Sequence, residues 1–189
     1  MTSELPKNLY HRTNHYKDIE SILNKRAIIP SIQLKKKETK CGSRSTDFVS
    51  LTEGKCVESG GKLQIVLNAE SILKKNEIFN LWRKIKETDP KSIFLRELEW
   101  RSCDSVKFEK DDIQEIVLYK NYMTKDTPHL GDSSYKREMT IQEKGIKDIG
   151  KKYKIPIRIV PIESKECNKK EIEQELEEII YGNTNTYKS

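Results

Sequence analysis

The sequence lacks the features that mark membrane proteins and disulfide scaffolds. No apolar run approaches the roughly 20 residues that a spanning helix needs, and the opening MTSELPKNLY has no apolar core of the secretory-signal kind. The four cysteines are separated by 15, 47 and 64 residues and form no Cys-x-x-Cys pair, so they match neither a zinc site nor a disulfide framework. We therefore expect a reduced, cytoplasmic protein without a metal site or a membrane partner.

Aromatic residues are also scarce, at 7% of the chain, and hydrophobic residues make up only 34%. Charged residues reach 35%, against about 25% in a typical globular protein. The apolar residues nevertheless gather in short blocks such as 63–67 and 116–119, which favours a folded chain. A length of 189 residues predicts one domain with a tail. We place the domain at residues 1–162, and an acidic C-terminal helix with a frayed end at 163–189.

Positive charge is unevenly distributed. The chain carries +6 overall, but residues 163–189 carry −3, which leaves +9 on residues 1–162. Part of this excess lies in residues 34–44, a Gly-containing loop with a net charge of +4. Such a body favours anionic partners such as nucleotides, nucleic acids or acidic protein faces, although solubility alone explains it equally well. A nucleic-acid binder that uses Lys35–Lys37, Lys40 and Arg44 is therefore one alternative.

The apolar periodicity predicts a small α+β domain. Prolines at positions 156 and 161 place the last predicted strand at a sheet edge, because proline cannot donate to a ladder. Residues 92–101 fit neither the helix nor the strand period. The predicted strands are 9–12, 48–52, 63–67, 105–108, 113–119 and 155–162, and the predicted helices are 16–25, 69–75, 78–87, 135–153 and 168–181.

Two short blocks contain candidate binding residues. In LYHRT, His11 lies in a short strand just before a helix, from which an imidazole can face a cleft. In FVSLT, Ser50 and Thr52 project to one face of a strand, because side chains alternate with a period of two. Two hydroxyls on one face can hold a ribose or a carboxylate. Taken alone, LYHRT is also typical of a strand with a structural histidine, and FVSLT is also typical of an ordinary half-exposed strand.

A third block, ELEWR, contains two carboxylates. In an extended segment Glu97 and Glu99 share a face, roughly 7 Å apart, with Leu98 packed behind them. Such pairs serve glycosidic chemistry, since one carboxylate stabilises a developing oxocarbenium ion while the other orients or deprotonates the nucleophile. In so charged a chain the same pattern also describes a solvated face with weak salt bridges.

The order of the three blocks resembles the ADP-ribosyltransferase superfamily. More closely, LYHRT…DIESILNKRAIIPS, FVSLTE and ELEWR are similar to small bacterial and phage ADP-ribosyltransferase-like proteins, which include DNA-targeting toxins and abortive-infection-type proteins. The resemblance covers about residues 9–119. It implies a split sheet, mixed or antiparallel, with flanking helices and with NAD bound as a substrate in the cleft between the two halves.

The resemblance also implies a role for each candidate near the nicotinamide ribose. Glu99 would grip the ribose 2′-hydroxyl and favour the oxocarbenium-like transition state, because a fixed carboxylate stabilises the positive charge that develops there. Ser50 and Thr52 would support the nicotinamide ribose and the acidic residue. Glu97 would orient the acceptor.

The remaining candidates would bind the other half of NAD. His11 would bind near the adenosine ribose, and Arg12 and Arg44 are candidates for the pyrophosphate, which a guanidinium grips with two hydrogen bonds. Members with a Ser-x-Thr second block usually begin with Arg rather than His, and here Arg12 follows His11 directly.

We thus expect a mono-ADP-ribosyltransferase that transfers ADP-ribose from NAD to a macromolecular acceptor, either protein or nucleic acid, in phage–host conflict. One alternative is a non-catalytic protein that inhibits or recruits a host or phage factor. The other is the basic nucleic-acid binder described above.

Overall fold

The computed structural model describes residues 5–30, 48–53, 62–91, 98–120, 133–161 and 169–181. Arg44, Glu97 and the predicted basic loop at 34–44 lie outside these ranges. No helix in the described ranges is both long enough and apolar enough to cross a lipid bilayer.

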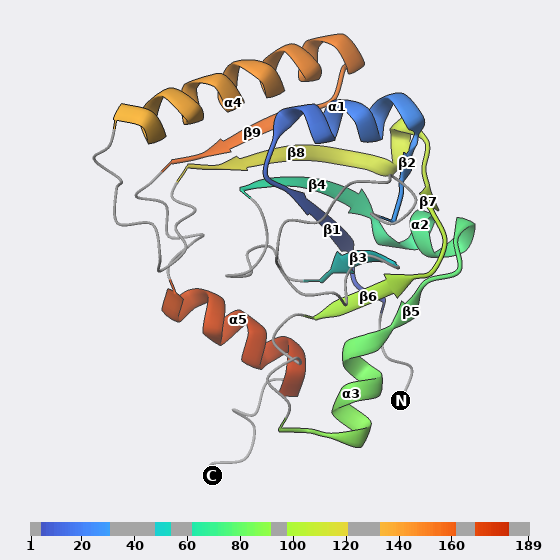
Figure 1. Ribbon diagram of the computed structural model, residues 1–189. Coiled ribbons are helices and arrows are strands. Elements are labelled where there is room, and N and C mark those ends of the chain that lie inside the picture. The colour runs from blue at the N-terminus through green and yellow to red at the C-terminus, as the bar shows by residue number, and fades with distance from the viewer. Residues whose placement is uncertain are drawn as a thin grey trace.

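Seven strands form one mixed sheet (Figure 1). They are β1 (Asn8–Thr13), β3 (Val49–Thr52), β4 (Leu63–Asn68), β5 (Phe79–Asn80), β6 (Glu99–Ser102), β8 (Ile113–Tyr119) and β9 (Ile157–Val160). Their spatial order is β5-β6-β3-β1-β4-β8-β9, and only the β8–β9 pair is parallel among the described strands. The predicted α+β class is therefore confirmed, and so is the edge position of β9 between its two prolines.

The sheet consists of two well-paired halves. In one half, β1 pairs along its full length with β4, from Asn8 opposite Asn68 to Thr13 opposite Leu63. In the other half, β3 pairs along its full length with β6. Between β1 and β3 the described residues show one register pair, Tyr10 opposite Thr52. The two halves thus share a short line of contact in the middle of the sheet.

Two helices cover one face of the sheet (Figure 1). These are α1 (Tyr16–Lys25) and α4 (Ser133–Tyr153), which lie side by side. The side chain of His15 caps α1 by accepting the Lys17 amide N–H, and the helix ends where Arg26 adopts a left-handed conformation. The main core under these helices includes Leu9, Ile19, Ile65, Leu67, Ile116, Leu118, Ile146 and Ile149, all buried.

The opposite face of the sheet contains a smaller apolar cluster, as strand alternation requires. Tyr10, Val66, Val117, Tyr119 and Val160 are all buried and pack together there. They come from four neighbouring strands, β1, β4, β8 and β9. The sheet is therefore packed on both faces around its centre.

The helix predicted at 78–87 begins later than expected. Phe79 and Asn80 form strand β5 instead, paired with β6. The helix is α3 (Leu81–Thr88), because the Asn80 side chain caps it by accepting the Arg83 amide N–H at 2.9 Å. The prediction was wrong at this end because the apolar Ile78 and Phe79 fit the helical period as well as a strand.

The acidic C-terminal helix packs on the body of the protein. It is α5 (Lys169–Tyr181), and its buried Leu176 and Ile180 belong to the main core. The Lys86 ammonium of α3 donates a hydrogen bond to the Ile180 carbonyl and lies 5.9 Å from the centre of the Tyr181 ring. A cation near the last carbonyls of a helix is favourable, since these are the negative end of its dipole.

The remaining elements are α2 (Ala69–Lys75), β2 (Ala27–Ile28), β7 (Val106–Lys107) and the 3-10 turn η3 (Lys110–Asp112).

Candidate functional site

The three sequence blocks lie on three adjacent strands. β1 contains His11 and Arg12, β3 contains Ser50 and Thr52, and β6 contains Glu99, and these strands follow one another in the sheet. Segments separated by about 90 residues in sequence are thus brought side by side. The sequence predicted this assembly only through the resemblance.

Cross-strand register shows which side chains share a face. Tyr10 lies opposite Thr52, and Thr52 lies opposite Glu99, so these three side chains form one row across β1, β3 and β6. Ser50, opposite Arg101, lies on the same face in the next row. The predicted common face of Ser50 and Thr52 is therefore confirmed.

The two candidates on β1 point to opposite faces. By alternation from Tyr10, Arg12 projects to the face of Thr52 and Glu99, whereas His11 projects to the other face, on the side of α1. His11 nevertheless reaches β3 at the level of the backbone, where its Nδ1 lies 3.2 Å from the Ser50 carbonyl oxygen. The first block thus contributes to both faces of the sheet.

Glu99 is a buried carboxylate held by a neighbouring cation. Its side chain is 10% exposed, and the Arg101 Nη2 donates a hydrogen bond to Oε2 at 2.7 Å. The Arg101 guanidinium also stacks 4.2 Å from the centre of the Phe48 ring, which restricts its orientation. Leu98, just before Glu99, is fully buried in a left-handed conformation with φ of 45°. The Glu99 carboxylate is therefore held by Arg101 on β6, which is itself positioned by Phe48, just before β3.

His11 is neutral at physiological pH. Burial lowers its pKa and outweighs the hydrogen bond to Ser50, which raises it; nearby Arg12 lowers it further. A carbonyl oxygen can only accept, so the hydrogen bond requires the proton on Nδ1. The Nε2 of the neutral ring is then an acceptor, suited to a hydroxyl donor.

A cleft of about 290 Å³ lies beside His11 and Arg12, between β1, α1 and β2. This volume is near the lower end of the ~300–1,000 Å³ range of ligand pockets. Its lining residues include His11, Arg12, Asn14 and Asp18, whose polar groups are of the kinds that a ribose and a phosphate need. Ser50, Thr52 and Glu99 are not among the described residues that line this cleft. The cleft and the β3–β6 face are therefore separate parts of the candidate site.

The sequence reasoning missed a buried carboxyl group at the end of β3. Glu53 directly follows the Ser-x-Thr block, and its side chain is only 5% exposed. Burial raises its pKa, and the nearby Arg83 guanidinium and the indoles of Trp100 and Trp82 only partly offset that rise. The Glu53 amide N–H also donates to the Leu98 carbonyl at 3.1 Å, which ties the end of β3 to the start of β6. The block FVSLTE contained Glu53, but its partners come from distant α3 and β6.

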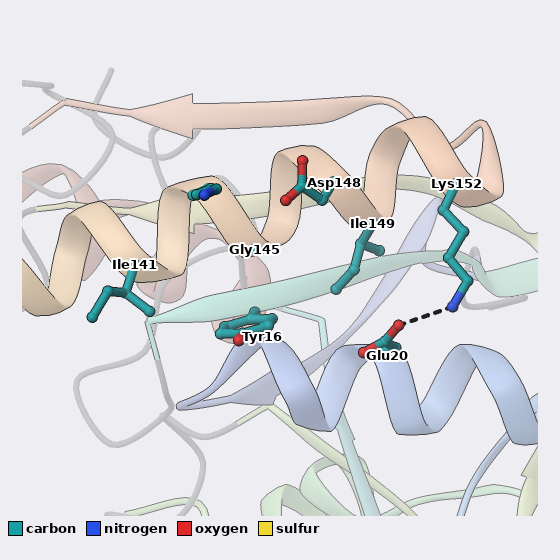
Figure 2. A pocket seen from close by; sticks show the side chains of 8 residues that line it. Tyr16, Glu20, Ile141, Gly145, Asp148, Ile149 and Lys152 are labelled. Atoms are coloured by element: carbon teal, nitrogen blue, oxygen red, sulfur yellow. Dashed lines mark hydrogen bonds and ion pairs between the residues drawn. The ribbon is translucent and has the colours of Figure 1, made fainter.

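A second groove, of about 490 Å³, lies between α1 and α4, on the helical side of the sheet (Figure 2). The Tyr16 ring lies against α4 at Gly145, and an ion pair of 2.9 Å between Lys152 and Glu20 closes one end. None of the seven predicted site residues lies in the lining of this groove as the structure describes it.

No protein-family model matches the chain, and no curated protein matches it.

Proposed function

We propose that this protein is a mono-ADP-ribosyltransferase that transfers ADP-ribose from NAD to a macromolecular acceptor, protein or nucleic acid. The observation that supports it is the juxtaposition of Ser50, Thr52 and Glu99 on one face of two paired strands, next to the strand of His11 and Arg12. The proposal places the reaction in the phage–host conflict that the sequence resemblance implies.

Glu99 is the catalytic residue of this proposal. Breaking the bond between nicotinamide and its ribose develops positive charge on the sugar, and a fixed carboxylate stabilises that charge. Arg101 holds Oε2 of Glu99 at 2.7 Å, which leaves Oε1 to accept a hydrogen bond from a ribose hydroxyl. Thr52, directly opposite Glu99, and Ser50 supply hydroxyls to the same sugar. Glu97 keeps its proposed role in orienting the acceptor.

The other half of NAD belongs beside β1. Arg12 shares the face of Ser50 and Glu99 and also lines the cleft, so its guanidinium is suited to a pyrophosphate between the two regions. His11, through Nε2, is suited to the adenosine ribose. Arg44 keeps its proposed role as a second pyrophosphate ligand.

The test is transfer of label from NAD to candidate acceptors, with nicotinamide release measured in parallel. We expect Glu99→Gln to lose about 100-fold or more of both signals, as removal of a group that stabilises developing charge does. Ser50→Ala should weaken NAD binding more than it slows the reaction. Glu87→Gln, at an exposed glutamate of α3, is the matched control and should retain wild-type activity.

Two results would overturn the proposal. One is equal transfer by wild type and Glu99→Gln. The other is a wild type that neither binds NAD in calorimetry nor releases nicotinamide, yet captures one protein partner in a fixed ratio. That second result would establish the non-catalytic binding protein instead.

A further inference from the structure

The outward face of α4 contains a row of positive charge. Arg137, Lys144, Lys147 and Lys151 recur at intervals of seven, three and four residues, and all four are exposed. These intervals follow the helical period, so the four side chains lie along one side of the helix. We call this row the basic stripe.

The fold turns the basic stripe towards solvent. The opposite side of α4 packs on the sheet through Met139, Gln142, Ile146 and Ile149, all buried. In Figure 1, α4 is the outermost element on its side of the molecule. At 1.5 Å per residue, the stripe from Arg137 to Lys151 is about 21 Å long on a straight rod.

Acidic residues only partly neutralise the basic stripe. Lys147 pairs with Glu143 at 2.6 Å, an exposed pair of little energy. Asp148 lines the groove towards α1 together with Lys144, so it lies beside the stripe. Over the part of the chain that the structure describes, Lys144 and Lys151 have no acidic partner.

We propose that the basic stripe binds the phosphodiester backbone of a nucleic acid. Cations repeated along a rigid rod match a polymer with one phosphate charge per 3.4 Å along each strand. A lipid surface fits less well, because insertion needs apolar residues along the exposed face. Between Arg137 and Lys144 the stripe instead contains Thr140, while the exposed Ile141 lies in the groove towards α1, which Lys144 also lines. This inference does not depend on the proposed transferase activity.

The test is the salt dependence of binding to a labelled 24-base-pair DNA duplex and to one of its single strands, by fluorescence anisotropy. If the stripe neutralises four phosphates, log K against log salt has a slope of about −3.6 for the duplex and about −2.8 for the single strand. Duplex affinity then falls about 150-fold between 50 and 200 mM salt. The tighter of the two affinities at the same salt concentration identifies the preferred form of nucleic acid.

Lys144→Gln/Lys151→Gln is the decisive variant. It should reduce the duplex slope by about 1.8, because two phosphates lose their cations. The control is Lys84→Gln/Lys91→Gln, which makes the same change in net charge at exposed lysines of α3 and the turn after it. The control should keep the wild-type slope. Thermal unfolding of both variants checks that they are folded.

Three results would overturn the proposal. The first is no binding of either DNA at 20 mM salt. The second is equal slopes for the two variants, which would make the effect one of net charge. The third is binding of vesicles with anionic headgroups that is stronger than DNA binding and is lost in Lys144→Gln/Lys151→Gln, which would assign the stripe to a membrane surface.

Discussion

The Glu53 carboxylate lies 3.8 Å from the Arg83 guanidinium, beside both tryptophans of the chain. Trp82 lies in the first turn of α3 and Trp100 lies on β6, so this carboxyl group is where α3, β3 and β6 meet. Burial raises the pKa of Glu53 above its usual 4.5 in spite of the cation. Indole fluorescence is therefore a local probe of its protonation.

Glu53 should make stability depend on pH. Glu53 takes up its proton more readily in the folded state than in the unfolded state. Protonation of Glu53 therefore stabilises the folded protein fully below pH 4.5, and this contribution is lost as pH rises through the raised pKa. We expect Glu53→Gln to be more stable than wild type at pH 8, with the difference narrowing towards pH 4.5. Urea unfolding followed by tryptophan fluorescence measures it. The prediction fails if Glu53→Gln and the surface variant Glu87→Gln give the same pH profile.

The Arg101–Glu99 pair should stabilise the fold more than an exposed pair. Arg101→Gln leaves a largely buried carboxylate without its cation, at a cost of about 2 kcal/mol in the free energy of unfolding. Arg26 pairs with Glu109 at 3.2 Å, but both side chains are more than 60% exposed, so Arg26→Gln should cost ~0–1 kcal/mol. Urea titration at pH 7 compares the two variants. Equal costs would mean that the buried pair has no special energy.

Gly145 should tolerate no larger residue while Tyr16 is present. A Cβ at this position would overlap with the Tyr16 ring, so Gly145→Ala should destabilise the protein by about 1–3 kcal/mol despite the better helix propensity of alanine. In a Tyr16→Leu background the overlap is relieved, and the same substitution should cost less. A double-mutant cycle of melting temperatures measures the difference. Additive effects would contradict direct contact between the ring and α4.

Asp112 should stabilise the protein only when ionised. Burial alone raises its pKa, but hydrogen bonds from Lys75, Ser71 and the Glu109 amide outweigh that effect and hold the pKa below its usual 3.8. The stabilisation is therefore present above about pH 4 and is lost as pH falls further. Asp112→Asn should cost about 2 kcal/mol at pH 7 and show less loss on acidification. Acid titration of far-UV circular dichroism tests this, and identical curves would contradict it.

Local pattern was sufficient to predict elements whose ends are coded by nearby residues. The bounds of α1, α2 and β8 agree with the predicted ranges 16–25, 69–75 and 113–119. The two-residue strands β2 and β5 were missed, because so short a segment has no period to detect. Within the ambiguous range 92–101, β6 begins at Glu99, directly after the left-handed Leu98, and a residue in that conformation interrupts the strand period.

The candidate site was predictable within each strand and unpredictable between strands. Alternation alone placed Ser50 and Thr52 on one face, as the structure confirms. The sequence does not say that β1 pairs with β3 at Tyr10 and Thr52, and this pairing is what puts His11 on the face opposite Glu99. Likewise, no sequence feature near Glu53 predicts that Arg83 of α3 lies beside it.

Among the described residues, one register pair, Tyr10 opposite Thr52, joins β1 to β3. Leu9 on β1 and Leu51 on β3 belong to the same buried core beneath this join. Ser50, Thr52 and Glu99 lie on one well-paired half of the sheet, and His11 and Arg12 lie on the other. The relative placement of the two parts of the candidate site therefore depends on how that core packs.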